Sequence, residues 1–217
     1  MKYQGNPNFS HKQHDKIGIL ITNLGTPDAP KKGDLKRYLR EFLSDPRVVE
    51  IPRLLWRMIL NFVILNIRPK RSAKAYSTVW TERGSPLLFH TKDQADALRK
   101  KLQERHGESI VVEFAMRYGS PSVDSVIDKM LKQGVRKLLV LPLYPQYCAS
   151  TTASTFDAIA ASFAKKRLIP ELRFINHYHD FPNYIQAVAD KIRQHWQVNG
   201  RADKLIFTYH GIPKRYL

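Results

Sequence analysis

The chain has 217 residues, of which 43% are hydrophobic, enough for a substantial globular core. Its 36 Lys and Arg against 19 Asp and Glu give a net charge of +17, which favours nucleic acid, an anionic membrane surface or carboxylate-bearing ligands as partners. The single cysteine, Cys148, excludes an internal disulfide, cannot hold a structural zinc or an iron–sulfur cluster alone, and indicates a reducing compartment.

Strand and helix patterns alternate along the chain. The continuous apolar run at 17–24 ends at Gly25-Thr26-Pro27 and predicts a buried parallel strand. The same reasoning predicts further strands over 110–116, 137–141, 172–178 and 205–209, and helices over 32–43, 52–67, 73–80, 92–106, 122–133, 151–166 and 183–198. Basic residues 68–71 are expected to form the turn between the second and third helices. This alternation predicts an α/β fold built from parallel βαβ units.

The loops that follow the predicted strands share an unusual composition. They contain Arg117-Tyr118-Gly119-Ser120-Pro121, the tyrosine- and hydroxyl-rich segment 144–152, and Tyr209-His210-Gly211. The carboxyl ends of parallel strands meet at one edge of a sheet, where open α/β folds bind ligands. Turn formation and helix capping explain any one of these loops alone. Together they suit a flat aromatic ligand with acidic substituents.

These stretches resemble the ferrochelatase family, whose members insert ferrous iron into protoporphyrin IX, and most closely its proteobacterial members. The resemblance runs from about residue 18 to the last residue and is carried by the following motifs. They are Asn23-Leu24-Gly25-Thr26-Pro27, Leu43-Ser44-Asp45-Pro46-Arg47-Val48-Val49, Gly84-Ser85-Pro86-Leu87, Tyr118-Gly119-Ser120-Pro121, Leu141-Pro142-Leu143-Tyr144-Pro145-Gln146-Tyr147, Ser150-Thr151-Thr152 and Tyr209-His210-Gly211-Ile212-Pro213-Lys214-Arg215-Tyr216.

The resemblance implies a chelatase-like α/β fold with two Rossmann-like domains, each a four-stranded parallel sheet, and with porphyrin in the cleft between them. Residues 1–198 would form the first domain, including lip helices over 51–80, and 199–217 would begin the second. Family members continue for roughly another hundred residues, about the size of a small domain. That part carries a glutamate that faces the active-site histidine, so we expect the 217-residue chain alone to be inactive.

The resemblance identifies His210 as the catalytic histidine, acting as an iron ligand or as a proton acceptor. Both roles suit imidazole, because its pKa of ~6.5 allows it to accept a pyrrole proton near neutrality. Imidazole nitrogen is also a suitable donor for Fe²⁺. The position of His210 at the end of a predicted strand is weaker support for a functional role than the family motif around it.

Five further residues correspond to porphyrin-binding positions of the family: Arg117, Tyr118, Tyr144, Ser85 and Arg71. The Arg117 guanidinium suits a propionate through charge-assisted hydrogen bonds, whereas position alone favours a solvated cation at a strand end. Arg71 is aligned across a one-residue gap.

The only metal that the resemblance implies is the substrate Fe²⁺, with no resident cofactor. Some relatives bind an iron–sulfur cluster through a cysteine at the position of Ala149, so we do not expect a cluster here. Residues 51–65 correspond to the family's lip, which touches the bilayer in membrane-associated members, although periodicity alone slightly favours a buried helix. Residues 1–16 lack the apolar core of a signal peptide, and no segment has the ~20 apolar residues of a membrane span. We therefore expect a cytoplasmic protein, peripheral at the inner membrane.

Two alternatives remain open at this stage. A porphyrin-binding fragment without turnover would keep the same pocket wall. A nucleic-acid-binding protein would explain the charge of +17, but the chain lacks a helix-turn-helix, zinc-finger or RNA-recognition signature. We expect protoporphyrin IX and ferrous iron as partners, and no nucleic acid.

Overall fold

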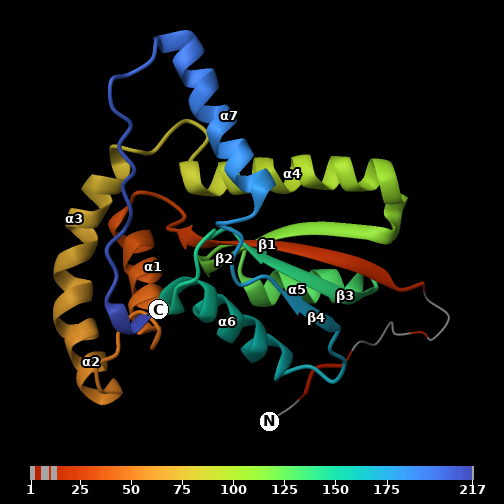
Figure 1. Ribbon diagram of the computed structural model, residues 1–217. Helices are drawn as coiled ribbons and strands as arrows, with labels where there is room; N and C mark the ends of the chain where they lie inside the picture. Colours follow the sequence, from red (N-terminus) through yellow and green to blue (C-terminus); the bar gives the residue numbers. More distant parts are fainter. Residues whose placement is uncertain (1–2, 6–9, 11–13, 217) are drawn as a thin grey trace.

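The computed structural model describes residues 3–5, 10 and 14–216, and its centre is one four-stranded sheet (Figure 1). The strands are β1 (Lys16–Thr26), β2 (Ile110–Gly119), β3 (Val135–Pro142) and β4 (Glu171–Phe174). All pairs are parallel and the order is β2-β1-β3-β4. The predicted α/β class with a parallel four-stranded sheet is confirmed.

Helices cover both faces of the sheet (Figure 1). On one face lie α5 (Val123–Lys132) and α6 (Ser154–Phe163), which follows the short π-helix η3 (Ala149–Ala153). On the other lies α4 (Pro86–His106), which ends in the 3₁₀ turn η2 (Gly107–Ser109). Leu20 of β1 and Val140 of β3 pack with α5 and α6 in the main core.

A second core joins the carboxyl end of β2 to a separate block of helices. This block contains α1 (Lys32–Ser44), α2 (Arg53–Ile59), the π-helix η1 (Leu60–Ile64) and α3 (Leu65–Ser77). Tyr118 of β2 is fully buried there, against Tyr38, Leu43, Leu60 and Leu65.

The predicted turn at residues 68–71 is wrong, because α3 continues through it with Pro69 inside the helix. The side chains of Leu65 and Pro69 are buried, whereas Arg68, Lys70 and Arg71 are exposed. The three cations remain solvated on the exposed side of the helix, so they do not interrupt it. Packing of the buried side chains on the other side stabilises the helix.

The last part of the chain also departs from the prediction. After α7 (Pro182–Asn199) no residue up to Pro213 lies in a strand, so the predicted strand over 205–209 is wrong. A strand needs a hydrogen-bonded neighbour, and residues 205–209 have none here. Their apolar side chains are therefore not covered, and Ile206 is 79% exposed. The 3₁₀ turn η4 (Lys214–Tyr216) then packs beside the end of α1, where Tyr216 Oη donates to the carbonyl of Val48 at 3.0 Å.

Candidate functional site

Two glycines bring the carboxyl ends of β1 and β2 into close contact. Gly25 has φ +108°, and a Cβ there would lie 1.8 Å from the carbonyl oxygen of Tyr118. Gly119 has φ +85°, and a Cβ there would lie 2.7 Å from the carbonyl oxygen of Thr26. Only glycine adopts such backbone without strain and without this clash. The two glycines thereby fix the backbone of Arg117 and Tyr118 at the end of β2.

A buried carboxylate, Asp45, lies at the centre of the polar contacts beyond this edge. Asp45 Oδ2 accepts hydrogen bonds from Arg117 Nη2 at 2.5 Å, Tyr118 Oη at 2.7 Å and Ser154 Oγ at 2.6 Å. Asp45 Oδ1 accepts from the backbone N–H of Arg47 at 2.7 Å. Helix α1, strand β2 and helix α6 thus meet at one acid, whose side chain is 3% exposed.

The electrostatics of this site favour the ionised form of Asp45. Burial alone would raise its pKa, but the hydrogen bonds from Ser154, Tyr118 and the Arg47 backbone, together with the Arg117 charge, hold that pKa below its ordinary value. The carboxylate therefore stabilises the fold above the unfolded-state pKa of ~3.9, and this stabilisation is lost as pH falls through the lower folded-state pKa.

We expect Asp45→Asn to lower the free energy of unfolding most at pH 6–7, because Asn cannot replace the ionised acceptor. The difference from the wild type should shrink as pH falls below the unfolded-state pKa of ~3.9 and then through the lower folded-state pKa of Asp45, where the wild-type side chain also becomes neutral. Urea unfolding at a series of pH values measures this. A difference that stays constant over the whole range would contradict the ionised state assigned to Asp45.

Tyrosine hydroxyls surround the same site. Burial raises the pKa of Tyr118, Tyr144 and Tyr38, so all three are protonated at neutral pH. Tyr38 donates to the carbonyl of Gly25 at 3.2 Å, but the buried Tyr144 hydroxyl has no hydrogen-bond partner. An unpaired buried hydroxyl is costly, so a hydrogen bond to a ligand or a water molecule would stabilise it.

The predicted site residues divide into two groups. Arg117 and Tyr118 are in contact, and Tyr144 lies within electrostatic range of both. Ser85 is buried immediately before α4, and Arg71 is exposed on α3. His210 is exposed in the irregular segment after α7, with no hydrogen bond or ion pair to any described residue. No described contact joins Ser85, Arg71 or His210 to the Asp45 site, and their assigned roles stay predictions.

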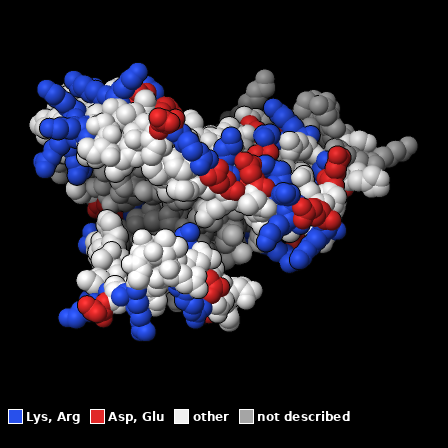
Figure 2. All heavy atoms as spheres, turned by 90° about the horizontal axis from the view of Figure 1, so that it is seen from above, with Lys and Arg blue, Asp and Glu red and all other residues white. Residues whose placement is uncertain are grey.

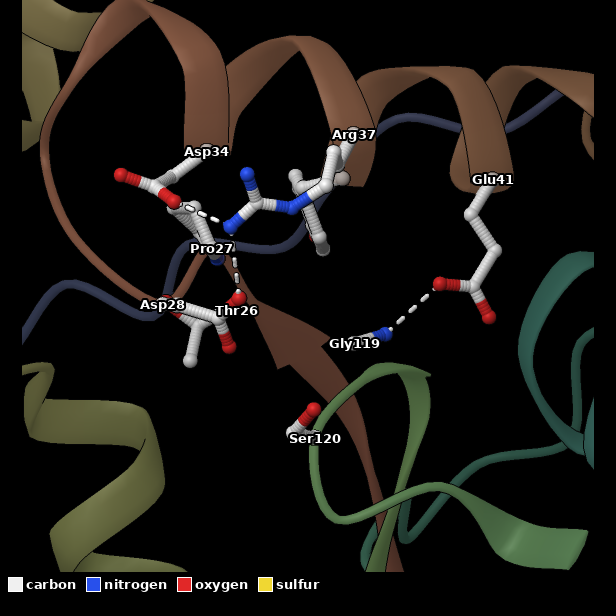
Figure 3. A pocket seen from close by; sticks show the side chains of 9 residues that line it. Thr26, Pro27, Asp28, Asp34, Arg37, Glu41, Gly119 and Ser120 are labelled. Atoms are coloured by element: carbon white, nitrogen blue, oxygen red, sulfur yellow. Dashed lines mark hydrogen bonds and ion pairs between the residues drawn. The ribbon is translucent and has the colours of Figure 1, made fainter.

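A small cavity lies on the outer side of the same strand ends (Figure 3). Arg37 donates to both Asp28 and Asp34 there, while Glu41 accepts from the backbone N–H of Gly119 at 2.9 Å. Its volume of about 200 Å³ is below the roughly 300–1,000 Å³ of usual small-molecule sites. None of the predicted site residues lines this cavity, which is too small to enclose a tetrapyrrole.

The segment predicted as the lip exposes apolar side chains among cations. Leu54 is 76% exposed, Phe62 75% and Ile67 70%. Figure 2 shows Lys and Arg gathered at the end of the molecule where α3 lies in Figure 1. The exposed cations of α2 and α3 are Arg53, Arg57, Arg68, Lys70, Arg71 and Lys74. These observations do not fit the alternative of an ordinary buried helix.

The described part of the chain offers neither a metal-binding cluster nor a membrane-spanning helix. Residues 3–5, 10 and 14–216 contain no cluster of three or more His, Cys, Asp or Glu side chains able to hold a metal ion. Over the same residues, no helix combines the length and the apolar character of a membrane span.

The geometry defines a parallel α/β domain with a polar, tyrosine-rich site at the carboxyl ends of its strands, the place where Rossmann-like domains bind ligands. Residues 16–217 match the family model for ferrochelatase, and the chain belongs to that family. Similar proteins named ferrochelatase come from Idiomarina loihiensis and Pseudoalteromonas atlantica, each 69% identical over 217 residues, and from Teredinibacter turnerae, 61% identical. They cover this whole chain, which spans only about 60% of their length.

Sequence reasoning missed the residue that organises the site. The pattern at Ser44-Asp45-Pro46 indicates only the end of a helix and part of a family motif. Its partners Arg117 and Ser154 are 72 and 109 residues away, so no local pattern reveals the pairing. The available signal was Asp45 itself, an acid directly after an apolar helix face in a chain where acids are scarce.

Proposed function

We propose that this chain supplies the porphyrin-binding half of a ferrochelatase, which inserts Fe²⁺ into protoporphyrin IX to form protohaem in the last step of haem biosynthesis. The observation that carries the proposal is the family match over residues 16–217. The polar site at the strand ends supports it, because an unpaired tyrosine hydroxyl beside an arginine suits a ligand that is apolar in its centre and polar at its edge.

The proposed mechanism assigns separate tasks to the two groups of residues. Arg117 and Tyr144 bind one side of the porphyrin, while the buried Tyr118 ring supports the Arg117 guanidinium. This binding energy favours the bent macrocycle that exposes nitrogen lone pairs. His210 accepts a pyrrole proton or binds the incoming ferrous ion, and its exposed imidazole is open to a partner group. Two protons must leave for each Fe²⁺ inserted, so a second acid–base group is required. We infer that the family's glutamate, which has no counterpart in these 217 residues, supplies it.

The test uses a chimaera of this chain followed by the carboxyl-terminal part of the Idiomarina relative that this chain does not cover. At 69% identity the interface between the two parts should be preserved. We expect the chimaera to convert protoporphyrin IX and Fe²⁺ to protohaem, measured by the change in porphyrin absorbance. The 217-residue chain should bind porphyrin, measured by fluorescence quenching, without turnover. A folded chimaera that neither binds nor metallates protoporphyrin would refute the proposed function.

We further propose that the protein is cytoplasmic and touches the inner membrane through residues 51–65. Replacing Leu54, Met58 and Phe62 with Ser should abolish sedimentation with anionic liposomes at raised salt. Each inserted side chain contributes roughly 1.5–3 kcal/mol. Each basic residue contributes about 1 kcal/mol near an anionic surface, and salt screens that contribution.

The matched control changes exposed apolar residues on another helix. Ile185 and Val198 of α7 are 53% and 83% exposed, and replacing them with Ser should leave sedimentation unchanged. If the triple variant stays folded and still sediments like the wild type, the membrane proposal is wrong.

A further inference from the structure

Asp45 is unusual because a deeply buried acid receives four separate donors. Three of them, from Arg117, Tyr118 and Ser154, converge on a single oxygen, Oδ2. A buried carboxylate is costly to desolvate unless its partners are well placed. The turn after α1 is itself shaped by this acid, since the backbone N–H groups of Val48 and Val49 donate to the Asp45 carbonyl at 3.1 and 3.0 Å. Both the side chain and the backbone of Asp45 are therefore fixed.

The consequence for Arg117 is that its guanidinium is held from two sides. Nη2 donates to Asp45, while Nε donates to the carbonyl and the hydroxyl of Ser154 at 2.9 and 2.7 Å. The guanidinium carbon also lies 4.4 Å from the ring centroid of Tyr118. A guanidinium has five N–H donors, so Nη1 keeps donors for another partner. The adjacent carboxylate compensates its positive charge.

We propose that Asp45 is a positioning residue that fixes Arg117 and Tyr118 for the porphyrin substrate. This inference rests on the proposed function and assigns a task to a residue that does not itself touch the substrate. Arg117 then binds the substrate through N–H groups of fixed direction, because its guanidinium is paired with the Asp45 carboxylate. It does not act as a mobile cation. Tyr118 is fixed in the same way, because its hydroxyl donates to Asp45 and its ring packs beneath the guanidinium.

The chain offers a matched control for the loss of Asp45. Asp157 of α6 pairs with Arg47 at 2.7 Å, so this exposed pair joins the same two segments without touching Arg117 or Tyr118. We expect Asp45→Asn in the chimaera to lower kcat/KM for protoporphyrin on the order of 10²-fold, because small misplacements of binding groups have effects of that size. Asp157→Asn should leave kcat/KM unchanged.

A protein without the Arg117 and Tyr118 functional groups shows whether Asp45 acts through them or only stabilises the fold. In a protein that carries both Arg117→Ala and Tyr118→Phe, adding Asp45→Asn should change kcat/KM by less than about threefold, since residues that act through one another are not additive. If Asp45→Asn does not fold, Ser154→Ala is the milder variant. It removes one donor to Asp45 and should lower kcat/KM by roughly tenfold.

A second measurement needs no turnover. Phenylglyoxal labelling of the 217-residue chain, located by mass spectrometry, should modify Arg117 at least about fivefold faster in Asp45→Asn than in the wild type, because its strongest partner is lost. Arg99, which donates to the Val112 carbonyl at 3.0 and 2.8 Å, is the internal reference for general unfolding and should label at the same rate in both.

The outcomes distinguish the two proposals. A folded wild-type chimaera that neither binds nor metallates protoporphyrin refutes the proposed function, and the labelling rates then still decide whether Asp45 holds Arg117. An active chimaera in which Asp45→Asn behaves like Asp157→Asn, in turnover and in labelling, overturns the role of Asp45. A loss of kcat/KM that persists undiminished in the Arg117→Ala, Tyr118→Phe background also overturns it.

Discussion

His210→Ala in the chimaera is expected to reduce iron insertion almost to zero while protoporphyrin affinity stays within about tenfold of the wild type. Among these 217 residues, the imidazole alone is assigned to accept a proton or bind Fe²⁺, and the opposing glutamate cannot perform both tasks without it. Binding survives because Arg117, Tyr118 and Tyr144 form a separate group of contacts. Steady-state turnover and fluorescence titration of the same preparations measure both quantities.

The matched control for this variant is another exposed histidine. Among the described residues, the hydrogen bonds of His195 in α7 are with Asn199 of its own helix, and His195→Ala should leave turnover unchanged. A His210→Ala protein that keeps even a tenth of wild-type turnover would show that His210 is not the central group.

Gly25→Ala is expected to destabilise the 217-residue chain by about 3–5 kcal/mol, a large share of the total for a domain. The new Cβ would lie 1.8 Å from the backbone oxygen of Tyr118, and φ there is +108°. A backbone atom held by the pairing of two strands cannot move aside as a flexible side chain can. Thermal and urea unfolding of the two proteins measure the loss.

Gly33→Ala provides the comparison, because it makes the same chemical change at an open position. A Cβ at Gly33 in α1 meets no atom within 4 Å. Alanine favours helix, so this variant should gain about 0.4–1 kcal/mol. If Gly25→Ala melted at the same temperature as Gly33→Ala, the close approach of β1 and β2 would be wrong.

Elements in contact with the core were predictable from sequence. The strands β1 and β3 are continuous apolar runs that end at glycine or proline, and the buried positions of α5 recur with helical spacing. In these segments the apolar residues of the sequence pattern are the ones that neighbouring strands and helices bury, so the pattern predicts the structure correctly.

The two wrong predictions concern segments whose structure depends on partners. Residues 205–209 have the composition of a strand, but only a neighbouring strand makes a strand of them, and none pairs with them here. The basic segment 68–71 looked like a turn, yet burial of Leu65 and Pro69 keeps it helical. The division of the chain at residue 199 stays a prediction.

The candidate site was predictable only in part, for the same physical reason. Arg117 and Tyr118 lie at the end of β2, and Tyr144 follows β3, so their place at this edge was predictable from the strand pattern. Their role as porphyrin contacts came from the family resemblance. Asp45 follows a helix, and only the packing of α1 against β2 and α6 gives it partners. The same resemblance supplied the roles of His210, Ser85 and Arg71, which the described contacts do not connect to this cluster.

The turn that follows α1 has a consequence for the order in which the protein folds. Its contacts span 72 residues to Arg117, 109 to Ser154, 165 from Glu50 to Arg215 and 168 from Val48 to Tyr216. Non-local contacts form slowly, because the entropy of closing long loops is lost before any interaction compensates for it. On the ribosome, which adds about 5–20 residues per second, the turn leaves the exit tunnel seconds before its last partners exist. The corner around Asp45 is therefore among the last parts to become ordered, and until then Asp45 remains accessible to solvent and to other proteins.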